Sequence, residues 1–152
     1  MKKYKLTEET KEWYGRTLYR IESLVDFNDV KVGDKGGFIE KEDNLSQNDD
    51  AWVYDDAWVY GNAWVSGNAR VSGNACVCGN ADIFWISKTG SRLDTTTLYK
   101  NKDGGISVSC GCFKGTLEEF EKKVEETHGD NKYGKEYKTL IQLAKIHFGV
   151  EE

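Results

Sequence analysis

The chain has 152 residues, of which 31% are charged and 38% are hydrophobic, and its formal net charge is −5 at pH 7. This length suits one compact domain or two small ones. Acidic and basic residues are mixed along the chain, so direct binding of nucleic acid is not expected. No apolar run is long enough to cross a membrane, and the opening residues MKKYKLTEETKE lack the apolar stretch of a secretory signal.

Residues 1–38 predict strands and turns. Within TLYRIESLVDF, apolar residues alternate with polar ones as in a half-buried strand, namely Tyr19, Ile21, Val25 and Phe27. The segment VGDKGG at 32–37 predicts a turn. We expect this region to be a β cap over the structure that follows, because an open stack of strands exposes unpaired backbone groups.

Between Ala51 and Ile86, a unit of six residues repeats six times: AWVYDD, AWVYGN, AWVSGN, ARVSGN, ACVCGN and ADIFWI. Every sixth residue is Val or Ile with Ala two positions earlier, so both side chains share one face of a short strand. Gly-Asn pairs at 61–62, 67–68, 73–74 and 79–80 predict sharp corners. The repeat therefore predicts a triangular coil whose units bury their apolar side by stacking on one another.

Ile39 and Leu45 fit as degenerate units before the regular ones, and the long step from Leu45 to Ala51 predicts a bulge at 48–50. The repeat resembles that of the hexapeptide-repeat, left-handed β-helix family, in which three units form one turn. The resemblance implies a left-handed β-helix over 39–86. Stacking of residues eighteen positions apart then places Trp52 under Arg70, Trp58 under Cys76 and Trp64 under Asp82.

Residues 82–112 predict three more strands, DIFWIS, DTTTLYK and GISVSCGCF, separated by the turns KTGS and NKDGG. The period becomes helical over 116–148. Thr116 and Glu119 form a capping box for a first helix, which Gly129 ends after His128 in its last turn. Its apolar face carries Leu117, Phe120 and Val124, and the stripe of a second helix contains Tyr133, Tyr137, Leu140, Ile141, Ala144 and Phe148.

The expected fold class is α+β and mainly β. A short left-handed β-helix at 39–86 is capped by the N-terminal strands of 1–38. An α+β region at 87–152 follows, with a small sheet and a C-terminal helical hairpin that packs against it.

The motifs TLYRI, GDKGGFIEKEDNLSQ, AWVYGNA, GSRLDTTT and CGCFKGTLEEF together resemble those of small hexapeptide-repeat proteins of phages and prophages. The resemblance covers nearly the full chain and implies a phage protein that acts in the host cytoplasm. Proteins with left-handed β-helices are often trimeric, so we expect a homo-oligomer, either a trimer or a dimer that seals a shared face.

The four cysteines stand in two C-x-C pairs, Cys76 with Cys78 and Cys110 with Cys112. Structural zinc sites more often use C-x2–4-C spacing, because C-x-C on a flat strand splays the two sulfurs along the strand. Ordinary thiols in a reducing cytosol are therefore favoured over zinc or a disulfide scaffold. No metal and no cofactor is expected.

Outward positions of successive repeat units carry large aromatic residues. Exposed tryptophans on a protein surface usually have something covering them. The N-terminal strands, the helical tail or a second copy of the chain are the first candidates, and a partner surface is the alternative. The residues of this candidate interaction surface are Trp52, Trp58, Trp64, Tyr54, Tyr60 and Arg70, where Trp52 and Arg70 also predict a cation–π contact.

The segment KTGSRLDTTTLY at 88–99 is the best candidate for a small-ligand site. The Gly90-Ser91 turn predicts backbone N–H groups that point at an anion, and Arg92 offers a fork that matches phosphate. The alternative is a plain turn with Arg92 paired to a surface carboxylate. The candidate ligand residues, chosen for charge, hydroxyl groups or stacking, are Ser91, Arg92, Asp94, Thr95, Thr97, Lys88, Trp85, Tyr99 and Lys114.

Three functions fit these features. The first is a non-enzymatic phage counter-defence protein that sequesters a phosphorylated small molecule, such as a nucleotide-type immune signal. The second is an inhibitor that binds a host defence protein through the aromatic face. The third is an acyltransferase. Many acyltransferases with a left-handed β-helix resemble one another in using a histidine as general base. His128 and His147 both fall in the helical tail and outside the repeats, so no catalytic residue is assigned.

Overall fold

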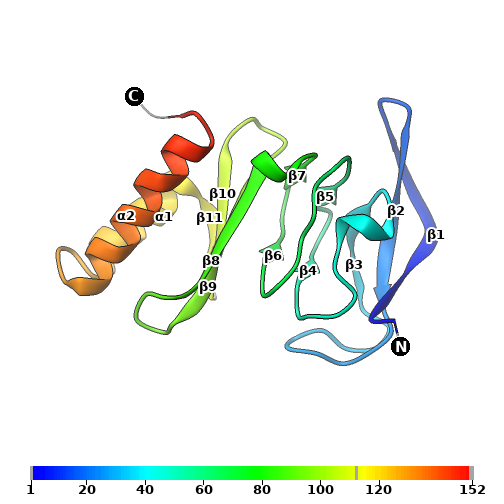
Figure 1. Cartoon of the computed structure of the whole chain (residues 1–152), viewed down its shortest axis with the longest axis horizontal. Coiled ribbons are helices and arrows are strands. Elements are labelled where there is room, and N and C mark those ends of the chain that lie inside the picture. Colours follow the sequence, from blue (N-terminus) through cyan, green and yellow to red (C-terminus); the bar gives the residue numbers. More distant parts are fainter. Residues whose placement is uncertain (1, 112, 151–152) are drawn as a thin grey trace.

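A computed structural model describes residues 2–111 and 113–150. Three layers follow one another along the long axis of the molecule in Figure 1: N-terminal strands, a stack of short coils, and a sheet covered by two helices. The fold is mainly β, with several sheets and a C-terminal helical hairpin, as the sequence predicts. None of the described helices combines the length and the hydropathy needed to span a bilayer.

The N-terminal layer is an antiparallel hairpin of β1 (Tyr4–Trp13) and β2 (Arg16–Ser23), followed by β3 (Lys35–Ile39). Strand β3 pairs antiparallel with β2 and parallel with the coil strand β5 (Trp58–Val59). The N-terminal strands therefore continue the first side of the coil. Because β3 belongs to both layers, the boundary expected between residues 38 and 39 falls inside a strand.

The coil contains β5, β4 (Trp52–Val53), β6 (Arg70–Val71) and β7 (Cys76–Val77), with a short 3-10 helix at Glu42–Asn44. Its rungs pair in parallel, Trp52 with Arg70 and Trp58 with Cys76, which confirms those two stacked pairs. Each ladder is only two residues long, so the rungs form a short stack and not a closed β-helix.

The repeat valines and alanines fill the inside of the coil. All of them are at most 1% exposed, and they are Val53, Val59, Val65, Val71, Val77, Ala51, Ala57, Ala63, Ala69 and Ala75. Three of the predicted corners, at Gly61, Gly67 and Gly73, have left-handed backbone with φ between 63° and 65°. The fourth corner is built differently: Gly79 lies at a bend with extended backbone, φ −158°, and the chain leaves the coil there through a 3-10 helix at Asn80–Asp82.

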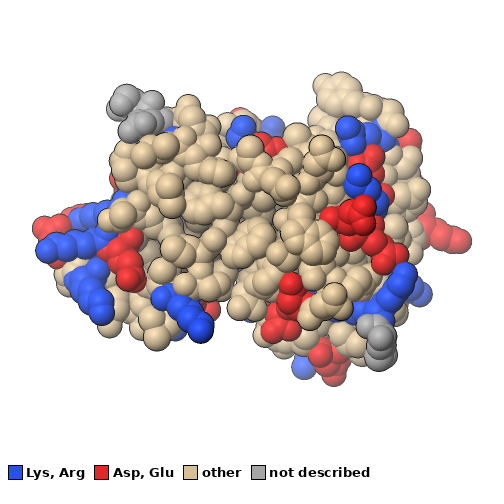
Figure 2. Space-filling model, viewed as in Figure 1, with Lys and Arg blue, Asp and Glu red and all other residues tan. Residues whose placement is uncertain are grey.

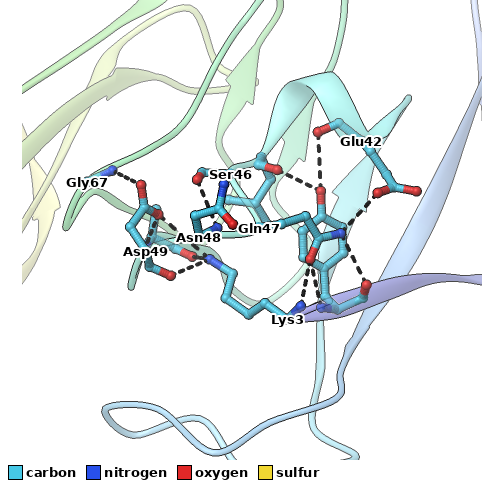
Figure 3. A network of polar contacts seen from close by, with 10 residues as sticks. Lys3, Glu42, Ser46, Gln47, Asn48, Asp49 and Gly67 are labelled. Atoms are coloured by element: carbon cyan, nitrogen blue, oxygen red, sulfur yellow. Dashed lines mark hydrogen bonds and ion pairs between the residues drawn. The ribbon is translucent and has the colours of Figure 1, made fainter. Parts of the chain in front are cut away.

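The predicted bulge lies where the sequence places it. Ile39 and Leu45 pair with residues twenty positions later, Val59 and Val65, whereas Val53 pairs with Val71 eighteen positions later. The extra residues are therefore in the segment after Leu45, which a polar network holds in place (Figure 3).

The buried side chain of Lys3 organises this network. Its Nζ donates hydrogen bonds to the backbone oxygens of Asp49 and Ala51 at 2.8 and 2.7 Å, and lies 3.8 Å from the Asp49 carboxylate. Asp49 also accepts a hydrogen bond from the backbone N–H of Gly67 at 2.6 Å. The bulge is thus tied on one side to Lys3, directly before β1, and on the other side to the next coil.

The segment VGDKGG is not wholly a turn, which corrects the sequence prediction. Gly36 and Gly37 are buried in β3, and a Cβ on either residue would lie 2.5 Å from a backbone oxygen of the coil. The two glycines are therefore needed because β3 passes very close to the coil, and not because the chain reverses direction there.

The C-terminal sheet has the order β11-β10-β9-β8, with β8 (Ile83–Thr89), β9 (Asp94–Lys100), β10 (Ile106–Cys110) and β11 (Phe113–Thr116). Ile83 and Tyr99 pack into the coil core, whereas Leu98 and Val108 face the helices. Strand β8 begins inside the last repeat unit, so the expected boundary after residue 86 also falls inside a strand. The last unit, ADIFWI, is the first strand of this sheet and not another rung.

The helical hairpin, α1 (Leu117–Thr127) and α2 (Lys132–His147), covers the outer face of this sheet. The predicted capping box is present: Thr116 Oγ1 accepts a hydrogen bond from the N–H of Glu119, whose carboxylate accepts one from the N–H of Thr116. Gly129 has φ +57° directly after His128, which caps the C-terminal end of α1, as predicted. The predicted apolar stripes of both helices are buried or half-buried against the sheet.

Candidate functional site

A groove of about 790 Å³ opens between the coil, the loop that joins β2 to β3, and the β8–β9 hairpin. The loop and the hairpin both reach the lower edge of the molecule in Figure 1, and the same edge is indented in Figure 2. We call it the cationic groove, and its lining residues are Asn28, Asp29, Asn68, Arg70, Ser87, Lys88, Arg92, Leu93, Asp94, Thr95, Gly111 and Lys114.

Five of the nine residues predicted to bind a ligand line this groove: Lys88, Arg92, Asp94, Thr95 and Lys114. Lys88 and Arg92 come from the β8–β9 hairpin, and Thr95 comes from β9. The hydroxyl of Thr95 is hydrogen-bonded to that of Ser87 at 2.8 Å. Lys114 comes from β11 at the far side of the same sheet. The antiparallel sheet thus gathers residues that the sequence separates by up to 26 positions.

Three of the four cations of the groove have no polar partner among the described residues. Within the part of the chain that the structure describes, no hydrogen bond or ion pair engages the side chains of Arg70, Lys88 or Arg92. The two arginines elsewhere behave differently, because Arg16 pairs with Glu40, and Arg20 pairs with Glu9 and Asp56, each at 2.8 Å. The alternative expectation for Arg92, pairing with a surface carboxylate, is therefore wrong.

Lys114 lies over the ring of Tyr54, with Nζ 5.2 Å from the ring centroid. The hydroxyl of Tyr54 donates to Asp29 Oδ1 at 3.0 Å, and burial raises the pKa of Tyr54 above its usual value. The uncharged Tyr54 side chain thus contacts both Lys114 and Asp29 at one end of the groove. With four cations and two carboxylates, Asp29 and Asp94, the groove is locally positive in a chain whose net charge is −5.

Strained backbone accumulates around the same groove. Five described residues other than glycine have positive φ, and three of them line the groove: Asn28 at 47°, Lys88 at 63° and Leu93 at 52°. Left-handed backbone is unfavourable for a residue such as leucine, which is also 66% exposed here. Such strain gathers at sites where the chain is shaped for a ligand.

The remaining predicted ligand residues lie elsewhere. The backbone N–H of Gly90 donates to the carboxylate of Glu136 on α2, so this part of the predicted anion-binding turn is already filled by the chain itself. Thr97 is buried and accepts a hydrogen bond from the N–H of Arg70 at 3.0 Å. Tyr99 is 2% exposed and bonds to Ser72 and Ser109. Both join the coil to the sheet and neither is available for a ligand.

Trp85 packs against the coil core and lines a separate shallow hollow with Trp64. Neither Trp85 nor Tyr99 is in a position to stack on a ligand in the cationic groove. Sequence reasoning missed the contributions of Asn28, Asp29 and Asn68, and it assigned Arg70 to the aromatic surface. The one available signal was that Arg70 is the only charged residue at its position among the repeat units AWVYGN, AWVSGN, ARVSGN and ACVCGN.

A second hollow of about 200 Å³, which we call the aromatic pocket, adjoins the groove. It lies between α1, α2 and the sheet, and it shares Arg92, Asp94 and Gly111 with the cationic groove. Its other lining residues are Ser91, Cys110, Phe113, Phe120, Lys123, Val124, Thr127, His128 and Tyr137. Ser91 therefore contributes here and not in the groove.

The aromatic surface predicted on the coil is largely covered. Trp52 is 1% exposed and packs edge-on against Tyr4 and Phe27, and Trp58 is 8% exposed beside Trp13. N-terminal residues therefore cover both tryptophans, which agrees with the expectation of a cover from the chain itself and not with an open partner surface at these two positions. Among the described residues no cation–π contact joins Trp52 to Arg70, so that prediction is wrong. Other cations lie over the aromatic rings of the coil, among them Lys102, whose Nζ is 3.9 Å from the centroid of Trp58.

Tyr60 is half-buried and accepts a hydrogen bond from Trp13 Nε1 at 3.1 Å. Only Trp64 of the three tryptophans stays open, at 43% exposed. The middle of the face over β8 and the coil carries few charged side chains (Figure 2). Trp64 lines a shallow hollow with Phe84 and Trp85 of β8.

The cysteines show no metal geometry in the described ranges 2–111 and 113–150, where no cluster of His, Cys, Asp or Glu is suited to a metal ion. Cys112 lies outside these ranges. Cys78 donates to Asp82 Oδ2 at 3.1 Å, and burial together with that carboxylate raises the pKa of its thiol.

Comparison with known proteins adds one short match. No protein-family profile matches the chain. Over 62 residues the chain is 36% identical to an Escherichia coli K12 protein described as the uncharacterized acetyltransferase YdcK. The matched segment covers 36% of this chain and 19% of YdcK. The chain is thus similar to a small part of an acetyltransferase.

Proposed function

We propose that the cationic groove binds a small molecule that carries a phosphate group. The observation that supports this proposal is a set of cationic side chains. Among the residues that the structure describes, Arg70, Lys88 and Arg92 have no hydrogen-bond or ion-pair partner, and Lys114 lies against a tyrosine ring. Like charges gathered in a concave site repel one another, and an anionic ligand relieves this repulsion.

Phosphate fits this set better than a carboxylate does. A guanidinium fork binds either group bidentately, but a phosphate monoester carries nearly two charges and three terminal oxygens, so it can engage both guanidinium groups and a lysine at once. Asp29, Asp94 and the amides of Asn28 and Asn68 suit hydroxyl or amine groups on the rest of the ligand. The ligand class is therefore a phosphorylated compound with further hydrogen-bond donors.

Capture of such a ligand needs no catalytic residue, and it agrees with a binding protein that removes a phosphorylated signal from solution. The phage counter-defence role and the host cytoplasm stay predictions from the resemblance, as does assembly into a dimer or trimer. We also propose that the stacked coils are a short left-handed β-helix, because units of six residues pair at an offset of three units.

Isothermal titration calorimetry with inorganic phosphate tests the main proposal. An Arg92→Gln variant removes one charge-assisted fork from a half-open site, which costs about 1.5–3 kcal/mol or roughly 10–100-fold in affinity. Arg16→Gln is the matched control, because Arg16 does not line the groove and pairs with Glu40. Equal affinity in wild type and in both variants would contradict the proposal.

A second function, acetyl transfer, is supported by the YdcK match and by the position of His128. This histidine lines the aromatic pocket beside the groove, stacked on Tyr137 with ring centroids 5.7 Å apart. It is positioned to accept a proton from an amine or hydroxyl acceptor that attacks an acetyl thioester, after which the thiolate leaves and takes up the proton. The cationic groove then receives the phosphates of the donor.

Release of free thiol from acetyl coenzyme A, in the presence of simple amine and sugar acceptors, tests this second function. The His128→Gln variant loses turnover if His128 is the base. His147→Gln is the control, because His147 packs against Phe84 outside the pocket. If no acceptor gives thiol release while phosphate still binds, acetyl transfer is contradicted and phosphate binding remains as the proposed function.

The inhibitor hypothesis has less support, because the covered positions of Trp52 and Trp58 leave Trp64 as the main open aromatic residue of the predicted surface. Binding of a host defence protein stays a prediction that an interaction screen with Trp64→Ser would test.

A further inference from the structure

The aromatic pocket gives the proposed ligand a second half. Four ring-bearing residues line it, Phe113, Phe120, His128 and Tyr137. Their rings contact one another in pairs, Phe113 with Phe120 at 5.3 Å and Phe120 with Tyr137 at 5.5 Å between centroids. These are ordinary aromatic contacts, so the wall is already packed and presents a preformed apolar surface.

The pocket is continuous with the cationic groove. Arg92 and Asp94 line both hollows, and so does Gly111, on which a Cβ would lie 3.2 Å from Asp94 Oδ2. A side chain at position 111 would therefore reach toward that carboxylate at the junction of the two hollows. One ligand can thus place a phosphate beside Arg92 and extend an attached group into the pocket.

The size and the lining define the chemistry of that attached group. Apolar cavities of about 150 Å³ hold a benzene ring, so about 200 Å³ accommodates one aromatic ring. Polar groups lie among the apolar walls of the pocket: Lys123 and Thr127 on α1, Ser91 and Arg92 on the hairpin, and Asp94 at the start of β9. Ligand sites of this kind combine an apolar lining with a few orienting polar groups.

We infer that the ligand is a phosphate ester of an aromatic group, with the phosphate in the cationic groove and the ring in the aromatic pocket. This inference rests on the proposed phosphate-binding function.

A comparison of the affinities of two phosphate monoesters of equal charge tests the inference. Methyl phosphate and phenyl phosphate are titrated into the full chain, and phenyl phosphate is expected to bind at least tenfold more tightly. Thr127→Trp fills the pocket from the exposed end of α1, and it is expected to bring the affinity ratio of the two esters close to one. Thr139→Trp makes the same exchange at an exposed position of α2 outside both hollows, and it is expected to keep the wild-type ratio.

The outcomes separate the two proposals. If both esters bind wild type equally well, the aromatic pocket is not part of the site, while the phosphate-binding function stands. If the preference for phenyl phosphate survives in Thr127→Trp as it does in Thr139→Trp, the ring binds elsewhere and the inference is overturned. If neither ester binds, the proposed function itself fails. Unfolding curves of both variants show whether a lost preference reflects pocket filling or loss of the fold.

Discussion

Replacement of Gly37 by alanine tests how tightly β3 caps the coil. A Cβ at this position would lie 2.5 Å from the backbone oxygen of Ala57 and 2.7 Å from Val53 Cγ1. The oxygen of Ala57 also accepts the hydrogen bond from Phe38 N–H, at 2.8 Å, that joins β3 to the coil. The new methyl group cannot be accommodated by rotating a side chain, so the two backbones must separate.

Overpacking of this kind costs about 1–3 kcal/mol, and weakening of the hydrogen bond adds about 1 kcal/mol. For a chain of this length we expect Gly37→Ala to lower the melting temperature by roughly 5–15 °C. The matched control is Gly79→Ala, because Gly79 also has extended backbone and a Cβ there would meet no atom within 4 Å. That variant should melt at the wild-type temperature or slightly above it.

Differential scanning calorimetry of the three proteins gives the comparison. Equal melting temperatures for Gly37→Ala and Gly79→Ala would show that β3 does not lie against the coil as closely as described, and the account of the cap would be wrong.

Three further predictions concern stability. Thr116→Ala removes the cap of α1 and should lower the free energy of unfolding in urea by about 1 kcal/mol, whereas an unchanged midpoint would show that the cap is not formed. Burial lowers the pKa of Lys3 to about 8, against the attraction of Asp49 and Asp50. The unfolded chain therefore binds more protons between pH 8 and 10.5, so the stability of wild type relative to Lys3→Met should rise with pH across this window by at most about 3 kcal/mol. A flat difference between the two proteins from pH 7 to 10 would contradict the burial of Lys3. Lys102→Met removes the cation over Trp58 and should lower stability by about 0.5–1 kcal/mol, and identical thermal unfolding of both proteins would exclude that contact.

The coil and the helical hairpin could be predicted because their signals are local and periodic. Val and Ala two positions apart define an inward face whatever surrounds them, and the longer step after Leu45 marks the bulge without further information. The capping box of Thr116 and Glu119 likewise involves residues three positions apart. Such patterns depend on the backbone period, which the sequence carries directly.

Close approach between distant segments could not be predicted. Gly36 and Gly37 look like turn residues in sequence, and only the coil that packs on them explains why they are glycines. The last repeat unit keeps the Ala-x-Ile pattern but becomes a strand of another sheet, because its partner β9 follows later in the chain.

The candidate site could be predicted only in part, because some of its residues are neighbours in sequence and others are brought together by the fold. Lys88, Arg92 and Asp94 are neighbours in sequence, so their charge and turn pattern pointed to a site. Arg70 and Asp29 join them only because the coil brings the β2–β3 loop beside the β8–β9 hairpin. The Gly90 N–H pointed toward an anion in the sequence interpretation, but Glu136 of α2, 46 positions away, takes that place.

The most direct test of the cationic groove uses the four arginines of the chain as probes. In a two-dimensional NMR spectrum of the side-chain Nε–Hε groups, each arginine gives one signal, which single Arg→Gln variants assign. Titration with phenyl phosphate should shift the signals of Arg70 and Arg92, whose side chains pair with no other described residue, and leave those of Arg16 and Arg20 in place. Equal shifts of all four signals, or no shift at saturating ligand, would contradict the claim that this groove binds a phosphate group.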